Sequence, residues 1–104
     1  MNLKPGDLII DNMGREGIVW EEAETPQRGW IGLQNDERVR NVGDCTWWSV
    51  IPFTGGSVCV PEPLAKYLRP ATTEDAHRYS LQSGQSYNIL IKLFPDLSKV
   101  MARP

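Results

Sequence analysis

The chain has 104 residues, of which 40% are hydrophobic and 23% are charged, and its formal net charge is −2 at pH 7. This length is enough for one domain with its own apolar core, and the composition is that of a globular protein. No stretch approaches the ~18 continuous apolar residues of a membrane span, and the apolar segment near the N-terminus is too short for a signal peptide. We therefore expect a cytoplasmic protein that does not enter a membrane.

Short apolar segments in residues 1–61 alternate with turn residues, which is typical of an antiparallel β domain. Asn35-Asp36 and Thr54-Gly55-Gly56 fit tight hairpin turns. The predicted strands cover 7–11, 16–22, 29–34, 37–42, 45–51 and 57–60. Because these strands are short and closely spaced, we predict a small antiparallel β-barrel or compact curled sheet over residues 1–61.

The composition changes after residue 61, and two later segments favour helices. The first, about 73–83, follows a capping threonine, Thr72 or Thr73, and carries two acids in its first turn. The second, 87–94, fits a helix or a strand by its apolar run alone. A three-four spacing favours the helix, because it continues one stripe through Ala76, Tyr79, Ser83, Tyr87, Leu90 and Phe94.

The other C-terminal segments are expected to be less regular. Residues 61–68 read as a short helical turn, and Pro95 should end the second helix and leave the last residues frayed. No linker is long enough to separate two independent domains. We therefore predict an α+β fold in which a helical extension over 62–104 packs on the barrel as part of one folding unit.

Trp47 and Trp48 are adjacent in the strand predicted over 45–51. Strand side chains alternate between the two faces of a sheet, so both rings cannot enter one core. One ring can fill the barrel, while the other needs a cover. The tail offers a cover for the outward ring in the stripe through Tyr79, Tyr87, Leu90 and Phe94.

The roles of the four tryptophans stay open between two arrangements. In one, Trp20 and one of the adjacent pair fill the barrel, and the other two pack beneath the C-terminal helices. In the other, Trp30 and the outward member of the pair form an open aromatic platform for a ligand. Two arginines on one face of the strand predicted over 37–42 add a weak basic patch. The candidate binding surface therefore consists of Trp30, Trp47, Trp48, Arg38 and Arg40.

Residues that usually carry catalysis or hold a cofactor do not occur in recognisable arrangements. His77 is the single histidine, and no cysteine or histidine spacing suits zinc. Cys45 and Cys59 lie in predicted strands with apolar neighbours, which indicates free, buried thiols rather than a disulfide. We expect no enzyme activity, no metal and no cofactor.

Two segments resemble the SH3-like small barrels of the KOW and Tudor-like kind. The first is Gly6-Asp7-Leu8-Ile9-Ile10 followed by Gly14-Arg15-Glu16-Gly17-Ile18-Val19, and the second is the hairpin and turn over 47–64. The resemblance implies a non-catalytic binding module, because KOW-like barrels contact RNA, ribosomal or transcription partners and Tudor-like barrels bind peptides.

The net charges of the two parts of the chain distinguish a protein partner from a nucleic acid. Residues 1–62 contain ten acids and five bases, a net charge of −5, whereas residues 63–104 contain three acids and six bases, a net charge of +3. A nucleic-acid surface needs a basic stripe, which the acidic barrel region lacks. We therefore expect a protein partner, for an accessory, regulatory or inhibitor protein, with a nucleic-acid-binding barrel as the alternative.

Overall fold

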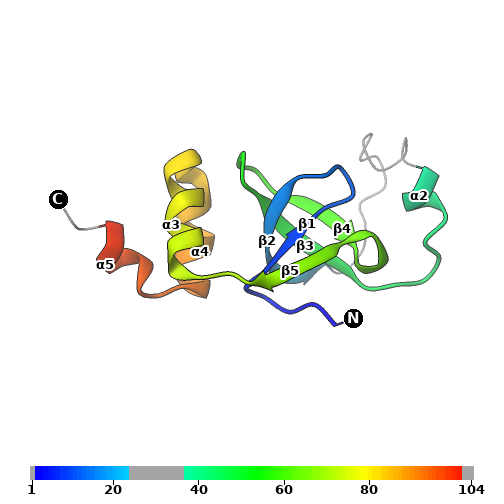
Figure 1. Ribbon diagram of the computed structural model, residues 1–104, viewed down its shortest axis with the longest axis horizontal. Helices are drawn as coiled ribbons and strands as arrows, with labels where there is room; N and C mark the ends of the chain where they lie inside the picture. The colour runs from blue at the N-terminus through cyan, green and yellow to red at the C-terminus, as the bar shows by residue number, and fades with distance from the viewer. Residues whose placement is uncertain (1, 24–36, 102–104) are drawn as a thin grey trace.

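The computed structural model describes residues 2–23 and 37–101, which form five strands and several helices. The elements are β1 (Asp7–Ile10), β2 (Glu16–Ala23), α2 (Glu37–Arg40), β3 (Trp47–Pro52), β4 (Val58–Pro61), η1 (Glu62–Leu64), β5 (Lys66–Pro70), α3 (Thr73–Gln82), η2 (Gly84–Ser86), α4 (Tyr87–Leu93) and α5 (Leu97–Met101) (Figure 1). The two elements labelled η are short 3-10 helices.

The strands form one antiparallel sheet in the order β4-β3-β2-β1-β5. Strands β1 to β4 lie side by side in chain order, and β5 returns to pair with the outer side of β1. Among the described strands β4 and β5 are the two edges and do not pair with each other, so hydrogen bonds do not close the sheet. The predicted α+β class is confirmed.

One face of the sheet encloses an apolar cluster of its own. Alternation along the strands selects its members: Val19 and Val50 lie opposite each other and point into this cluster, whereas Ile18 and Ile51 point to the other face. The buried members of this inner cluster are Leu3, Ile9, Val19, Trp48, Val50, Val60 and Ala65.

The other face packs against the C-terminal helices, which stand at one end of the sheet (Figure 1). This outer cluster combines sheet and helix residues, namely Leu8, Ile18, Ile51, Ala76, Tyr79, Leu90 and Leu97. Tyr87 and Phe94 pack against it half-buried, so five of the six residues of the predicted stripe meet here. The sixth, Ser83, instead ends α3.

Helix α3 begins after Thr72 because that residue and Asp75 form a capping box. The Asp75 N–H donates to Thr72 Oγ1 at 3.2 Å, and the Thr72 N–H donates to Asp75 Oδ2 at 2.8 Å. The predictions of a helix over about 73–83 and of a helix over 87–94 are both confirmed.

The strand predicted over 37–42 is wrong, because Glu37–Arg40 form the single helical turn α2. Val39 in this turn is buried. One buried apolar residue between charged neighbours fits a helical turn as well as a strand, so the local pattern could not separate them. The strand predicted over 29–34 and the turn at Asn35-Asp36 lie outside the described residues.

The helical turn predicted over 61–68 holds only for Glu62–Leu64, and the chain then extends into β5. Pairing with β1 determines this outcome, since Arg69 lies opposite Leu8 and Tyr67 lies opposite Ile9. The sheet therefore continues to Pro70, past residue 61.

The fraying expected after Pro95 is wrong for Leu97–Met101, and residues 102–104 lie outside the described residues. Leu97 begins α5 and is fully buried in the outer cluster. Its N–H donates to the Phe94 carbonyl oxygen at 2.9 Å. Burying a leucine side chain stabilises a fold by about 2 kcal/mol, so the burial of Leu97 favours the ordered turn.

Candidate interaction surface

Strand β5 differs from the other strands because every one of its five residues is exposed. It contains two of the large apolar side chains that the molecule leaves in solvent, Tyr67 at 39% and Leu68 at 41% exposure. Adjacent exposed apolar residues on one short strand are a feature of contact surfaces, whereas scattered ones need no explanation. We call Lys66, Tyr67, Leu68 and Arg69 the β5 surface.

A β-bulge shapes this surface. The register of β5 against β1 shifts between Leu8 and Ile9, so Leu68 is the extra residue without an opposite partner. Opposite residues share a face of a sheet, so Arg69 lies on the outer face with Leu8, and Tyr67 on the inner face with Ile9. The β5 surface therefore wraps around the edge of the sheet.

Arg69 connects this surface to the helices. Its Nη1 donates to Asp75 Oδ2 at 2.6 Å and its Nη2 to Asp75 Oδ1 at 3.0 Å, which is the bidentate geometry of a strong pair. The Arg69 guanidinium, together with hydrogen bonds from Thr72, holds the pKa of the Asp75 carboxyl well below its ordinary value. Asp75 thus stays ionised and fixes Arg69 in place.

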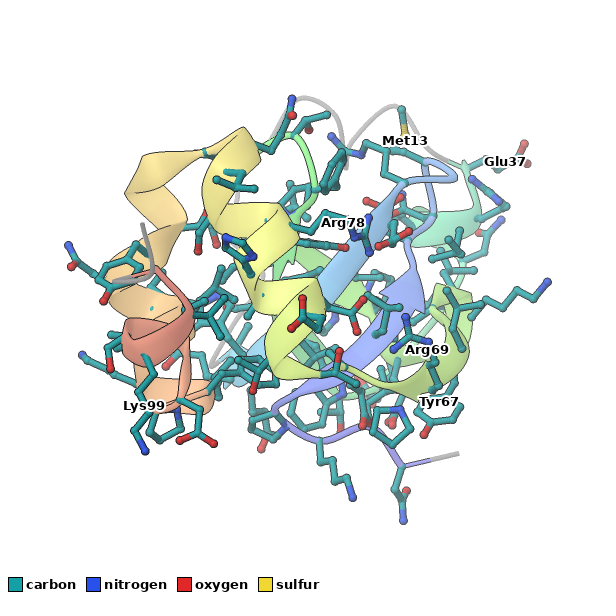
Figure 2. The ribbon with its side chains drawn as sticks, turned by 60° about the vertical axis from the view of Figure 1, so that its left-hand side comes forward. Met13, Glu37, Tyr67, Arg69, Arg78 and Lys99 are labelled. Carbon is teal, nitrogen blue, oxygen red and sulfur yellow. The ribbon has the colours of Figure 1, made fainter. Side chains whose placement is uncertain are left out.

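Arg78 forms the other end of the same network. It pairs with Glu16 of β2 and donates from Nη2 to Asp75 Oδ1 at 3.3 Å. Its guanidinium carbon lies 5.0 Å from the ring centre of Phe53 and 5.3 Å from that of Tyr79, within the range of cation–π attraction. Figure 2 shows Arg69, Arg78 and Tyr67 on one side of the molecule.

Tyr79 connects the network to the core. Its hydroxyl donates to Glu16 Oε1 at 3.1 Å, and its ring packs edge-to-face on Phe53 with the ring centres 5.2 Å apart. Burial, followed by the negative charge of Glu16, raises the pKa of Tyr79 well above its ordinary value. The hydroxyl therefore remains a hydrogen-bond donor.

The adjacent tryptophans occupy different environments, as alternation predicts. Trp48 enters the inner cluster and is 9% exposed, whereas Trp47 points to the outer face and is half-buried. The expectation that the tail covers the outward ring is wrong: among the described contacts, Trp20 packs on the outer cluster and Trp47 does not. The reason is position, because Trp47 begins β3 and the helices cover the opposite end, near Ile51.

The remaining members of the predicted binding surface are Trp30, Arg38 and Arg40. Trp30 lies outside the described residues. Arg38 is exposed on α2 and donates to the Asn12 carbonyl oxygen in the β1–β2 turn. Because residues 37–40 are helical, the strand alternation that would place Arg38 and Arg40 on one face does not apply.

Both cysteines are free and half-buried. Cys59 lies opposite Ser49 in the pairing of β3 with β4. Burial is the main cause that raises the pKa of both thiols. Within the described ranges, no group of three metal-binding side chains is placed to hold an ion.

Sequence reasoning missed the β5 surface because segment 61–68 read as a helical turn. A signal for an edge strand was nevertheless present: Lys66 and Pro70 are residues that protect exposed sheet edges from pairing with other chains. No helix in the described part of the chain is both long and apolar enough to cross a membrane. Comparison with protein-family models, curated proteins and solved structures found no match to this chain.

Proposed function

We propose that this chain is a non-catalytic protein-binding module, and that the β5 surface is where it contacts its partner. The observation that carries the proposal is that all five residues of β5 are exposed, including the adjacent apolar residues Tyr67 and Leu68. A folded domain that buries its core efficiently gains nothing from placing two neighbouring apolar side chains in water. A partner that covers them gains apolar burial without any change in the sheet.

An SH3-like barrel remains the fold relationship that we infer. The resemblance in residues 6–19 falls on β1, β2 and the turn between them. The hairpin of β3 and β4 is followed by η1, which matches the short helical turn that follows the closing hairpin in such barrels. The sheet also encloses its own inner cluster, separate from the cluster beneath the helices.

The experiment compares two leucine variants in affinity capture from the source cell. Leu68→Ser removes an apolar side chain from the β5 surface, and Leu81→Ser is the matched control, because Leu81 is 71% exposed on α3. The captured protein is then purified and its binding is remeasured by calorimetry. We expect Leu68→Ser to abolish capture and to weaken the purified complex, and Leu81→Ser to change neither. Equal binding by both variants would show that β5 is not the contact surface.

A further inference from the structure

We propose, on the basis of the protein-binding function above, that the β5 surface recognises an acidic segment of its partner. In this complex an apolar side chain of the segment packs on Tyr67 and Leu68, and its carboxylates meet Lys66 and Arg69. Three features carry this inference: the separation of charges around β5, the unused donors of Arg69, and the protected backbone edge.

Near β5, the basic side chains are more exposed than the acidic side chains that pair with them. The side chains of Arg69 and Arg78 are 50% and 43% exposed, whereas those of their acidic partners, Asp75 and Glu16, are 7% and 31% exposed. Lys66 is exposed and has no ion pair among the described residues. An approaching segment therefore meets the cations first. The exposed acid nearest in sequence to this network is Glu74, in the first turn of α3.

Arg69 is already oriented and still has donors to offer. A guanidinium has five N–H donors, and three hydrogen bonds are formed here: two to Asp75 and one to the Pro70 carbonyl oxygen. Two N–H groups thus have no partner among the described residues. Because the hydrogen bonds to Asp75 already fix the Arg69 side chain, the binding of a carboxylate does not have to supply the free energy of ordering that side chain.

The edge itself disfavours recognition by strand addition. β5 is short, carries Lys66, ends in Pro70 and has a bulge at Leu68, and each of these features hinders pairing with another strand. A second copy of the chain is also a poor occupant. A two-fold contact through this surface would bring Lys66, which has no ion pair among the described residues, close to its own copy, where like charges oppose association.

A nucleic acid is disfavoured for a different reason. The charge of Arg69 is balanced by Asp75 and that of Arg78 by Glu16, so Lys66 provides the unbalanced positive charge on β5. A phosphate backbone needs several such charges to displace its counterions. The exposed Leu68 has no role in that kind of contact, whereas a protein segment can bury it.

The test uses a random-peptide phage library as the probe, selected on the folded full chain. Selected peptides are synthesised and their affinities are measured for the wild type, Lys66→Glu, Leu68→Ser and Lys92→Glu. Lys92 is the matched control, because it is an exposed lysine on α4 in the last turn of that helix. We expect selected peptides to combine Asp or Glu with an aromatic or aliphatic residue. Lys66→Glu should weaken them about tenfold, and Lys92→Glu less than about twofold.

The outcomes separate this inference from the proposed function. Peptides that depend on Leu68 but carry no acids, or that bind Lys66→Glu as well as the wild type, would overturn the acidic partner and leave the protein-binding surface intact. Failure to obtain any peptide sensitive to Leu68→Ser would count against both. Binding of a single-stranded oligonucleotide that is lost in Lys66→Glu, or self-association in sedimentation that is lost in Leu68→Ser, would also overturn the inference in favour of the corresponding occupant.

Discussion

Gly17 of β2 lies so close to Val50 of β3 that a β-carbon at position 17 would be 2.4 Å from Val50 Cγ1. The same β-carbon would lie 3.1 Å from the Ile51 carbonyl oxygen, so the backbone of β3 also limits the space. Both residues are buried, and Val50 belongs to the inner cluster. The glycine is therefore required by packing between neighbouring strands, although its backbone conformation is one that any residue can adopt.

We predict that Gly17→Ala lowers the free energy of unfolding by about 2 kcal/mol, because Val50 must move within a filled cluster. Urea denaturation measures this change. Gly84→Ala is the control, since a β-carbon there meets nothing within 4 Å, and its effect should stay within about 0.5 kcal/mol of zero. Equal midpoints for the two variants would contradict the close contact between β2 and β3.

Replacing Asp75 by Asn should destabilise the chain by about 2 kcal/mol near neutral pH, because it removes the bidentate bond to Arg69 and weakens the cap of α3. The matched control is Glu74→Gln, which changes an exposed acid in the same helical turn. Glu74→Gln should change the free energy of unfolding only slightly. Comparable losses in the two variants would show that the Arg69–Asp75 pair does not hold the helices to the sheet.

The Arg69–Asp75 pair should also make the free energy of unfolding depend on pH in the acidic range. The pKa of Asp75 is lower in the folded chain than its ordinary value of 3.8, so protonation favours unfolding. Its stabilising contribution is complete above about pH 5 and is lost as the pH falls through 3.8 toward the folded-state pKa. Urea denaturation at several pH values in this range measures how the free energy of unfolding changes with pH. This change should be smaller for Asp75→Asn than for the wild type. Identical changes in the two proteins would contradict the assignment.

Tyr79→Phe tests the hydrogen bond to Glu16 and should cost about 1 kcal/mol at neutral pH. The Tyr79 hydroxyl should also make the free energy of unfolding depend on pH in the alkaline range. The pKa of Tyr79 is raised above its ordinary value of 10.0 in the folded chain, so its contribution is present below pH 10 and is lost as the pH rises further. Absorbance of ionised tyrosine should therefore appear for Tyr79 together with unfolding. Its appearance well before unfolding would contradict the burial of the hydroxyl.

The two thiols should react slowly in the folded chain. Burial raises the pKa of Cys45 and of Cys59, so the reactive thiolate is scarce at neutral pH. Reaction with a chromogenic disulfide reagent should accelerate strongly in denaturant and should titrate both cysteines without a reductant. Cys45→Ser and Cys59→Ser assign the two rates. Fewer than two titratable thiols in the unreduced, denatured chain would reveal a disulfide.

The strands and helices that sequence patterns predicted correctly are those with complete local signals. A run of apolar residues over 18–20 predicts a buried strand, in which Ile18 and Val19 reach opposite faces, and Thr72 with Asp75 supplies both halves of a cap for α3. Such signals depend on neighbours in the chain, so they can be read from the sequence. β5 has no such pattern, because none of its residues is buried.

The errors arose where distant contacts decide the conformation. Segment 66–70 becomes a strand because β1 lies beside it, and Leu97 becomes ordered because the outer cluster has room for it. The candidate site was affected in the same way. Its predicted tryptophans were chosen from local strand alternation and aromatic chemistry, whereas exposure of Tyr67 and Leu68 follows from the place of β5 at the sheet edge.

The pairing of β1 with β5 also determines when β1 can be fully paired during synthesis of the chain. On the ribosome, β2 follows β1 directly and can pair with it, but the other side of β1 must wait until Lys66–Pro70 have emerged. During that interval β1 is an unprotected edge with Leu8 and Ile9, two residues that the finished fold buries almost completely. A nascent chain that stalls before Lys66, or a fragment that ends there, therefore presents a strand prone to pairing with other chains.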